Sequence, residues 1–110
     1  MVINGVEIDS EIVAYTLRND YLLIIQTRTT EYAIADAQLS DLEYLNQLIA
    51  DENRADFEGW YFVKKFVTHW DVSVFGIVTI QTDYNRCEFE IPSSRVEEAR
   101  EFLQSEFSVK

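Results

Sequence analysis

The pattern of apolar and polar positions predicts a chain rich in β-strands. In several segments apolar residues alternate with polar ones, and Val, Ile, Thr, Tyr and Phe are enriched there, which is typical of strands. The predicted strands are Glu11–Leu17, Tyr21–Thr27, Glu31–Ala35, Val72–Thr82 and Arg86–Ile91. Before them, Val2–Ile8 predicts a short hairpin, because its Asn4-Gly5 pair favours a type I′ turn.

Two segments have helical periodicity instead. Both begin with S-x-x-E, which is Ser40 to Glu43 and Ser94 to Glu97, and this spacing is typical of a capping box. Apolar residues then recur every three or four positions and predict one buried stripe on each helix. The predicted helices are Ser40–Asp51 and Ser94–Phe107. The stripes are Leu42, Leu45, Leu48 and Ile49 on the first helix, and Val96, Ala99, Leu103 and Phe107 on the second.

The two halves of the chain have the same order of elements. Ile25-Gln26-Thr27 and Ile80-Gln81-Thr82 lie 55 residues apart, and each is followed by a polar turn, a strand and a helix. This order indicates a βββα pseudo-repeat. The predicted fold class is therefore α+β, with a mostly antiparallel sheet and two helices packed on one face.

The segment Ala55–Trp70 fits neither period clearly. The pseudo-repeat favours a strand over Trp60–Thr68, equivalent to Glu11–Leu17. Asp56 offers the alternative of a capped short helix that runs to Lys65, with Gly59 as its weak point. Gly76 lies inside the predicted strand Val72–Thr82, where a glycine weakens the strand unless it marks a bulge or a close approach of two backbones.

Composition predicts one acidic globular domain over residues 1–110. Hydrophobic residues make up 47% of the chain, which is too apolar for a disordered segment, and the length suits a single core. The single cysteine, Cys87, cannot form an internal disulfide, and the N-terminus lacks the pattern of a signal peptide. Apolar runs are shorter than a membrane-spanning helix needs. We therefore expect a cytoplasmic protein without membrane contact.

The sequence carries no motif for catalysis, a metal or a cofactor. His69 and Cys87 are the only histidine and the only cysteine, so they cannot complete a structural zinc site. The three glycines do not form a nucleotide-binding loop. Alternation places Cys87 on the face of Phe89 and Ile91, which predicts a buried, inert thiol. We predict that the chain is not an enzyme and binds no cofactor.

Charge then becomes the main guide to function. The chain has 20 acidic and 9 basic residues, a formal net charge of −11. Such a surface repels phosphate backbones and anionic lipids and attracts cationic partners. The favoured hypothesis is a stoichiometric inhibitor that covers the basic surface of a nuclease or another nucleic-acid-binding protein, without itself contacting nucleic acid. Toxin-immunity proteins and phage anti-CRISPR proteins often have this character, and the resemblance is one of type.

The candidate contact residues are carboxylates on the predicted helix faces. They are Glu97, Glu98 and Glu101 as one group, and Asp41 and Glu43 as a second. A solvated helix face is the simpler interpretation of the same pattern. The alternative function is a homo-oligomeric structural module or a small-ligand-binding module, possible as a homodimer, in which the acidity only provides solubility.

Overall fold

The computed structural model describes residues 1–107, an elongated molecule of 42 × 26 × 22 Å. Its strands form three antiparallel sheets. The first is a hairpin of β1 (Val2–Ile3) and β2 (Val6–Glu7), whose turn residues Asn4 and Gly5 both have positive φ, as the predicted type I′ turn requires.

A five-stranded sheet follows, in the order β5-β4-β3-β7-β6. Its strands are β3 (Ile12–Leu17), β4 (Leu23–Thr27), β5 (Glu31–Ile34), β6 (Arg54–Phe57) and β7 (Trp60–Val63). A three-stranded sheet has the order β10-β9-β8 and consists of β8 (Val67–Val72), β9 (Ile77–Thr82) and β10 (Arg86–Glu90). The α+β class and the mostly antiparallel pairing are confirmed.

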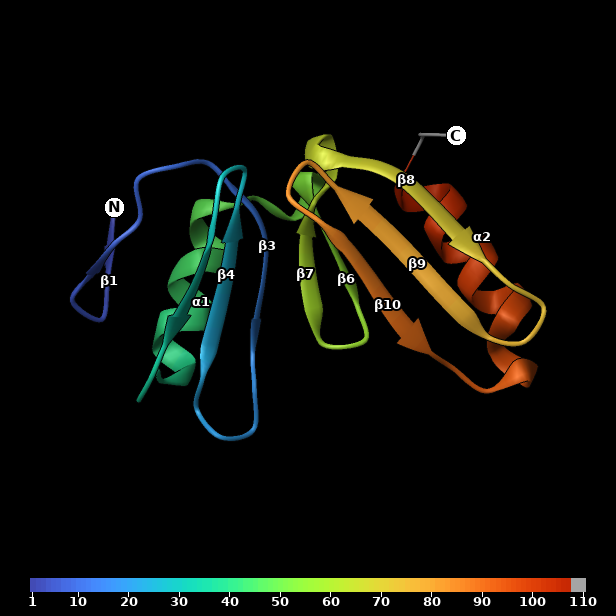
Figure 1. The fold of residues 1–110 in the computed structure, drawn as a ribbon, viewed down its shortest axis with the longest axis horizontal. Coiled ribbons are helices and arrows are strands. Elements are labelled where there is room, and N and C mark those ends of the chain that lie inside the picture. The colour runs from blue at the N-terminus through green and yellow to red at the C-terminus, as the bar shows by residue number, and fades with distance from the viewer. Residues whose placement is uncertain (108–110) are drawn as a thin grey trace.

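Each large sheet has its own helix. Helix α1 (Leu39–Leu48) lies on the five-stranded sheet, and α2 (Val96–Glu106) lies on the three-stranded sheet, at the other end of the molecule (Figure 1). Short 3₁₀ turns η1 (Asp51–Asn53), η2 (Lys64–Phe66) and η3 (Ser93–Arg95) connect the elements. One core lies between α1 and its sheet, and a second fills the space between the two sheets and α2.

The pseudo-repeat extends to hydrogen bonds. The register shift in β3 between Ile12 and Ala14 has its counterpart 55 residues later in β8, between Val67 and His69. The Thr27 hydroxyl accepts the amide hydrogens of Thr29 and Thr30, at 3.3 and 3.1 Å. The Thr82 hydroxyl does the same for the two equivalent residues. The βββα order therefore reflects two copies of one local structure.

Helix starts differ from the prediction. Helix α1 begins at Leu39, and its capping box joins Gln38 to Asp41, whose Oδ2 accepts the Gln38 amide hydrogen at 2.8 Å. Ser40 lies inside the first turn. Ser94 belongs to η3, so α2 begins only at Val96 and has no side-chain cap. On α1 the S-x-x-E spacing was misleading because Gln38 and Asp41 form the capping box two residues earlier.

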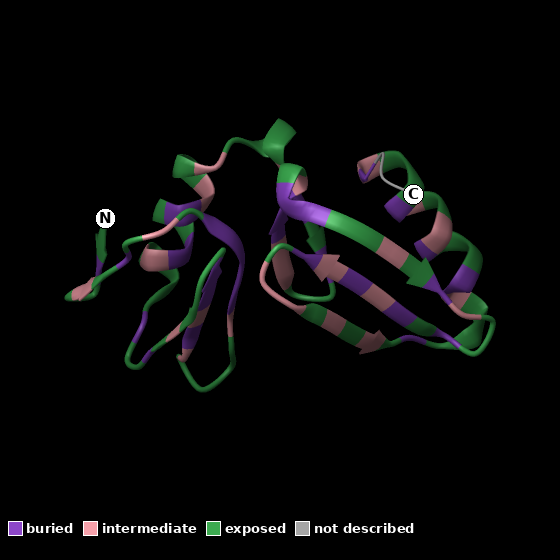
Figure 2. Cartoon of the chain, turned by 45° about the horizontal axis from the view of Figure 1, so that its top comes forward, coloured by how far each residue is buried: buried purple, intermediate pink, exposed green. Residues whose placement is uncertain are grey.

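The apolar stripe predicted on the second helix is confirmed, because Val96, Ala99, Leu103 and Phe107 are all buried. The stripe predicted on the first helix is confirmed only in part: Leu42 and Leu45 are buried, Ile49 is partly buried and Leu48 is 50% exposed. Each helix carries both buried and exposed residues (Figure 2).

The ambiguous segment forms β6, β7, η2 and the start of β8, so the alternative of a helix capped by Asp56 is wrong. The predicted strand Trp60–Thr68 is also wrong in its bounds, since η2 interrupts it, and the strand equivalent to β3 is β8. The predicted strand Val72–Thr82 is interrupted, because Ser73–Gly76 form the turn between β8 and β9.

Candidate functional site

The carboxylates predicted as contact residues do not form one surface. Glu97, Glu98 and Glu101 are exposed on α2, whereas Asp41 and Glu43 lie on α1 at the other end of the molecule (Figure 1). Several are already engaged within the chain. Glu97 accepts a 2.6 Å hydrogen bond from Arg100, and Asp41 completes the α1 capping box.

Three connecting segments converge between the two sheets. They are the turn after β4, the 3₁₀ turn η2 and the turn after β9 (Figure 1). The Arg28 amide hydrogen is donated to the Glu11 carbonyl at 3.1 Å, and the Asp83 amide hydrogen to the Phe66 carbonyl at 3.0 Å. The two bonds are equivalent, one within each repeat, and the 3.3 Å ion pair between Arg28 and Asp83 joins the two repeats. The fold thus brings together residues that are far apart in the sequence.

Basic side chains gather where these three segments converge, and two of them lie over one aromatic ring. The Arg28 guanidinium lies 5.3 Å from the centre of the Phe66 ring, and the Lys65 ammonium lies 5.1 Å from it. Arg86 begins β10 directly after the β9–β10 turn. Lys64, the first residue of η2, is instead engaged within the chain, because its ammonium pairs with Glu106 of α2 at 3.4 Å. We call Arg28, Lys65 and Arg86 the basic end; they are three of the nine basic residues of the chain.

The ion pairs of the basic end are loose. Arg28 lies 3.5 Å from Glu11 and 3.3 Å from Asp83, and Lys65 lies 3.7 Å from Glu11. The Arg28 and Lys65 side chains are 50% and 70% exposed, and exposed pairs of this kind contribute little to stability. Arg86 makes no ion pair with any residue of 1–107. These cations are therefore available to an external anion, whereas Arg54 and Arg100 are held by tight internal bonds.

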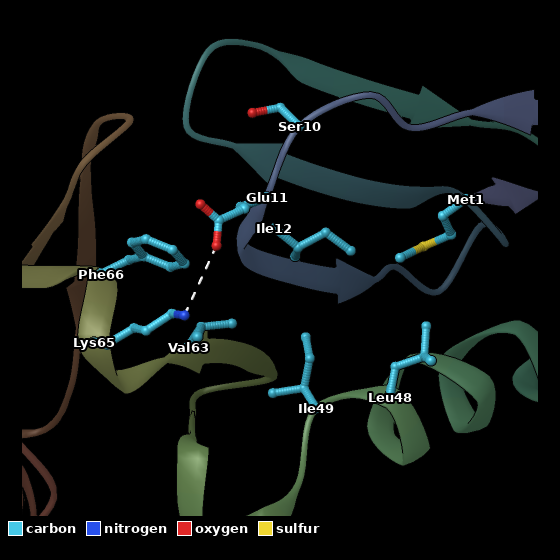
Figure 3. A pocket seen from close by; sticks show the side chains of 9 residues that line it. All are labelled: Met1, Ser10, Glu11, Ile12, Leu48, Ile49, Val63, Lys65 and Phe66. Atoms are coloured by element: carbon cyan, nitrogen blue, oxygen red, sulfur yellow. Dashed lines mark ion pairs between the residues drawn. The ribbon is translucent and has the colours of Figure 1, made fainter.

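An apolar groove of about 340 Å³ lies beside the basic end (Figure 3). Its walls come from the N-terminus, β3, the end of α1, β7 and η2. The apolar lining residues are Met1, Ile12, Leu48, Ile49, Val63 and Phe66. Sequence analysis missed this groove, because Leu48 was expected to complete the buried stripe of α1. Its 50% exposure shows instead that the stripe ends before the helix does.

Cys87 occupies the predicted strand face but is half-buried rather than fully buried. Its Sγ lies 3.6 Å from Asn85 Oδ1 and 4.0 Å from Gln26 Oε1. Burial, with a smaller contribution from the Glu31 carboxylate, raises the pKa of the thiol to about 11. The ordinary value is about 8.5, so its thiolate fraction at neutral pH is reduced roughly a hundredfold or more.

Native Cys87 should therefore react slowly with a thiol reagent at neutral pH. Because the thiolate is the nucleophile, the labelling rate should keep rising with pH until about pH 11. In denaturant the rate should level off near the ordinary thiol pKa. Stopped-flow measurement of labelling against pH, native and denatured, gives both curves. Coincident curves would show that the fold does not protect the thiol.

Within residues 1–107, no three His, Cys, Asp or Glu side chains come together as a possible metal-binding group. Neither helix of this described range has the length and apolar character needed to cross a membrane. The basic end and the adjoining groove remain the features with the clearest capacity to bind a ligand.

Comparison with known proteins identifies the fold. No family model matches the chain, and no curated protein matches it. Among solved structures, it is similar to the LytTr DNA-binding domain of a Bacillus cereus protein described as a methyl-accepting/DNA response regulator. The TM-score is 0.55 with 10% sequence identity, and the match covers 84% of this chain and 81% of that one. At this identity the likeness establishes the fold alone.

This likeness corrects the functional hypothesis. The interpretation as an acidic inhibitor of the anti-CRISPR-like or immunity type, with a basic protein as partner and no direct nucleic-acid contact, is wrong, because the similar domain itself binds DNA. The error came from using net charge, which is a sum over the whole surface, where the local arrangement of charges decides contact. That the chain is not an enzyme stays a prediction, because the likeness establishes the fold alone.

Proposed function

We propose that this chain is a LytTr-like DNA-binding module, a single domain of residues 1–110 that acts in the cytoplasm and contacts DNA through its basic end. The observation that carries the proposal is the convergence of loosely paired basic side chains from three turns of a LytTr-type fold. The likeness of the fold indicates DNA as the ligand to test, and the local charges indicate the surface that would contact it.

The basic end has the properties that phosphate contact requires. Arginine matches the planar geometry of a phosphate, and lysine supplies a point charge. The turn that carries Arg28 is braced by the Thr27 hydroxyl, and the turn before Arg86 is braced by the Thr82 hydroxyl. Rigid turns lower the entropy that is lost on binding. Exchange of the 3.3–3.7 Å internal pairs for phosphate contacts costs little, because such exposed pairs are weak.

The acidic remainder of the surface limits how DNA can approach. The exposed carboxylates of α1 and α2 repel phosphates, so only orientations that present the basic end are favourable. Three phosphate contacts, from Arg28, Lys65 and Arg86, predict a fall of log K with log salt of slope about −3. The resulting affinity is weak and strongly salt-dependent. The helix carboxylates then serve to orient the domain rather than to contact the ligand.

Double-stranded DNA should bind the protein at about 50 mM salt and largely dissociate at about 200 mM. Replacing Lys65 and Arg86 together with Glu should lower the affinity at least about tenfold and reduce the salt slope by about 2, because two phosphate contacts are lost. Fluorescence anisotropy of a labelled duplex, titrated at several salt concentrations, measures both quantities.

Arg18→Glu is the matched control. Arg18 is exposed and loosely paired with Asp20 at 3.7 Å, like Lys65 with Glu11, but it lies in the β3–β4 turn, outside the basic end. The control changes net charge without touching the proposed interface, so it should have a much smaller effect. Absence of binding by the unaltered protein at low salt would contradict the proposal. So would a Glu substitution at Arg18 that weakens binding as much, per residue, as those in the basic end.

A further inference from the structure

In the groove beside the basic end, the polar lining residues lie apart from most of the apolar ones. The polar residues Ser10, Glu11 and Lys65 come from the segment before β3 and from η2, and the remaining walls are apolar (Figure 3). Three of the apolar wall residues, Ile12, Val63 and Phe66, are at most 8% exposed and belong to the packed cores, so these walls are rigid. A volume of about 340 Å³ is at the lower end of the range for small-molecule sites.

Charge at the polar end favours an anion. Lys65 is the only basic side chain of the groove lining, and its single ion pair, with Glu11, is a loose 3.7 Å. Glu11 also pairs with Arg28, at 3.5 Å, so it keeps a cationic partner when Lys65 turns to a ligand. A cationic ligand at the same place would face both Arg28 and Lys65. The mouth of the groove is thus suited to one negative group.

We propose that this groove binds a small amphipathic anion, a flexible apolar chain of medium length that ends in a carboxylate. The apolar chain of the ligand lies against Ile12 and Val63 and covers the exposed surface of Leu48 and Met1, which are 50% and 44% exposed. The carboxylate accepts hydrogen bonds from the Lys65 ammonium. The Ser10 hydroxyl is the second hydrogen-bond donor at the polar end of the groove. The site is separate from any contact between the basic end and DNA, except that Lys65 belongs to both.

Decanoate is the probe for this proposal. Below its micelle concentration it should bind saturably with a 1:1 stoichiometry in calorimetry. It should bind at least about tenfold more tightly than decyltrimethylammonium, which has the same chain and the opposite charge. Backbone amide NMR should place the largest shift changes at Ile12, Leu48 and Lys65. Absence of saturable binding, equal affinity for the two probes, or shift changes elsewhere would each overturn the assignment.

Leu48→Gln tests the apolar wall, and Leu39→Gln is its control. Both leucines are exposed on α1, by 50% and 63%, but only Leu48 lines the groove. Leu48→Gln should weaken decanoate binding at least about fivefold, while Leu39→Gln should leave it unchanged. Equal losses in the two variants would contradict the site. Lys65→Glu should remove the preference for the anion and keep weak binding of the apolar chain.

Decanoate binding and DNA binding can be tested separately. Decanoate binding is measured without DNA, so it stands or falls independently of the proposed function. Leu48→Gln should impair decanoate binding and leave DNA binding unchanged, because Leu48 is not part of the basic end. Arg86→Glu should do the reverse, since Arg86 does not line the groove.

Discussion

Replacing Gly76 with alanine is expected to lower the free energy of unfolding by about 3 kcal/mol or more, from backbone strain and overpacking together. Gly76 has φ of +90°, a conformation that a residue with a side chain rarely adopts. A Cβ built at this position lies far inside van der Waals contact with the carbonyl oxygen of Ile91. Both causes of destabilisation therefore act at the same residue.

The local backbone cannot shift to relieve the clash. The Ile91 amide hydrogen is donated to the Gly76 carbonyl at 2.8 Å, and the Gly76 amide hydrogen to the Ser73 carbonyl at 3.1 Å. The Ser73 hydroxyl also accepts the amide hydrogen of Ile77, at 3.1 Å. Movement of Gly76 away from Ile91 would break the bond that joins the β8–β9 turn to the segment after β10.

Gly59→Ala separates the two causes. Gly59 has a similar φ of +82°, but no atom lies within 4 Å of the position its Cβ would take. This control should cost only about 1 kcal/mol, from the left-handed backbone alone. Urea denaturation followed by circular dichroism measures both variants. If the two substitutions lower the free energy of unfolding equally, the clash with the Ile91 carbonyl adds nothing to the cost of Gly76→Ala.

The sequence was sufficient for the elements whose periodicity is strong. Alternation predicted β5 and β10 to within one residue, because exposed residues alternate along each strand with more buried ones. It predicted β4 to within two residues, although β4 is largely buried on both faces. The 55-residue offset also predicted that the two halves are equivalent, and the structure extends this to the hydroxyl contacts of Thr27 and Thr82. Helix boundaries were less certain, since caps depend on single side-chain hydrogen bonds.

The basic end was not predicted, because its residues are scattered along the sequence. Arg28 and Lys65 come together only when the two repeats pack and bring both cations against the Phe66 ring. One signal was present: Arg28 and Asp83 lie 55 residues apart, as do Glu11 and Phe66, so both pairs occupy equivalent repeat positions. Sequence alone does not show that equivalent positions touch. That contact depends on how the two sheets are joined through β7 and η2.

Arg54 illustrates a second contact that periodicity does not reveal. Helix α1 has no basic residue in its last turn, so its C-terminal carbonyls need another donor. Arg54, from the start of β6, supplies it: Nη1 donates to the carbonyls of Asn46 and Ile49, at 2.9 and 2.6 Å. Nη2 donates to Asp51 at 2.5 Å. The side chain is only 11% exposed and joins α1 to the five-stranded sheet.

Arg54→Met should therefore lower the free energy of unfolding by about 3 kcal/mol, because polar groups in a partly buried site lose their charged donor. Arg54→Lys should recover only part of this loss, since a single ammonium cannot match the fork that contacts two carbonyls and a carboxylate. Arg18→Met, at an exposed and loosely paired position, is the control and should cost less than about 1 kcal/mol. Urea denaturation gives the energies, and amide hydrogen exchange should show faster opening at the end of α1 in Arg54→Met. A loss no larger than that of Arg18→Met, with unchanged exchange in α1, would show that Arg54 does not hold the helix to the sheet.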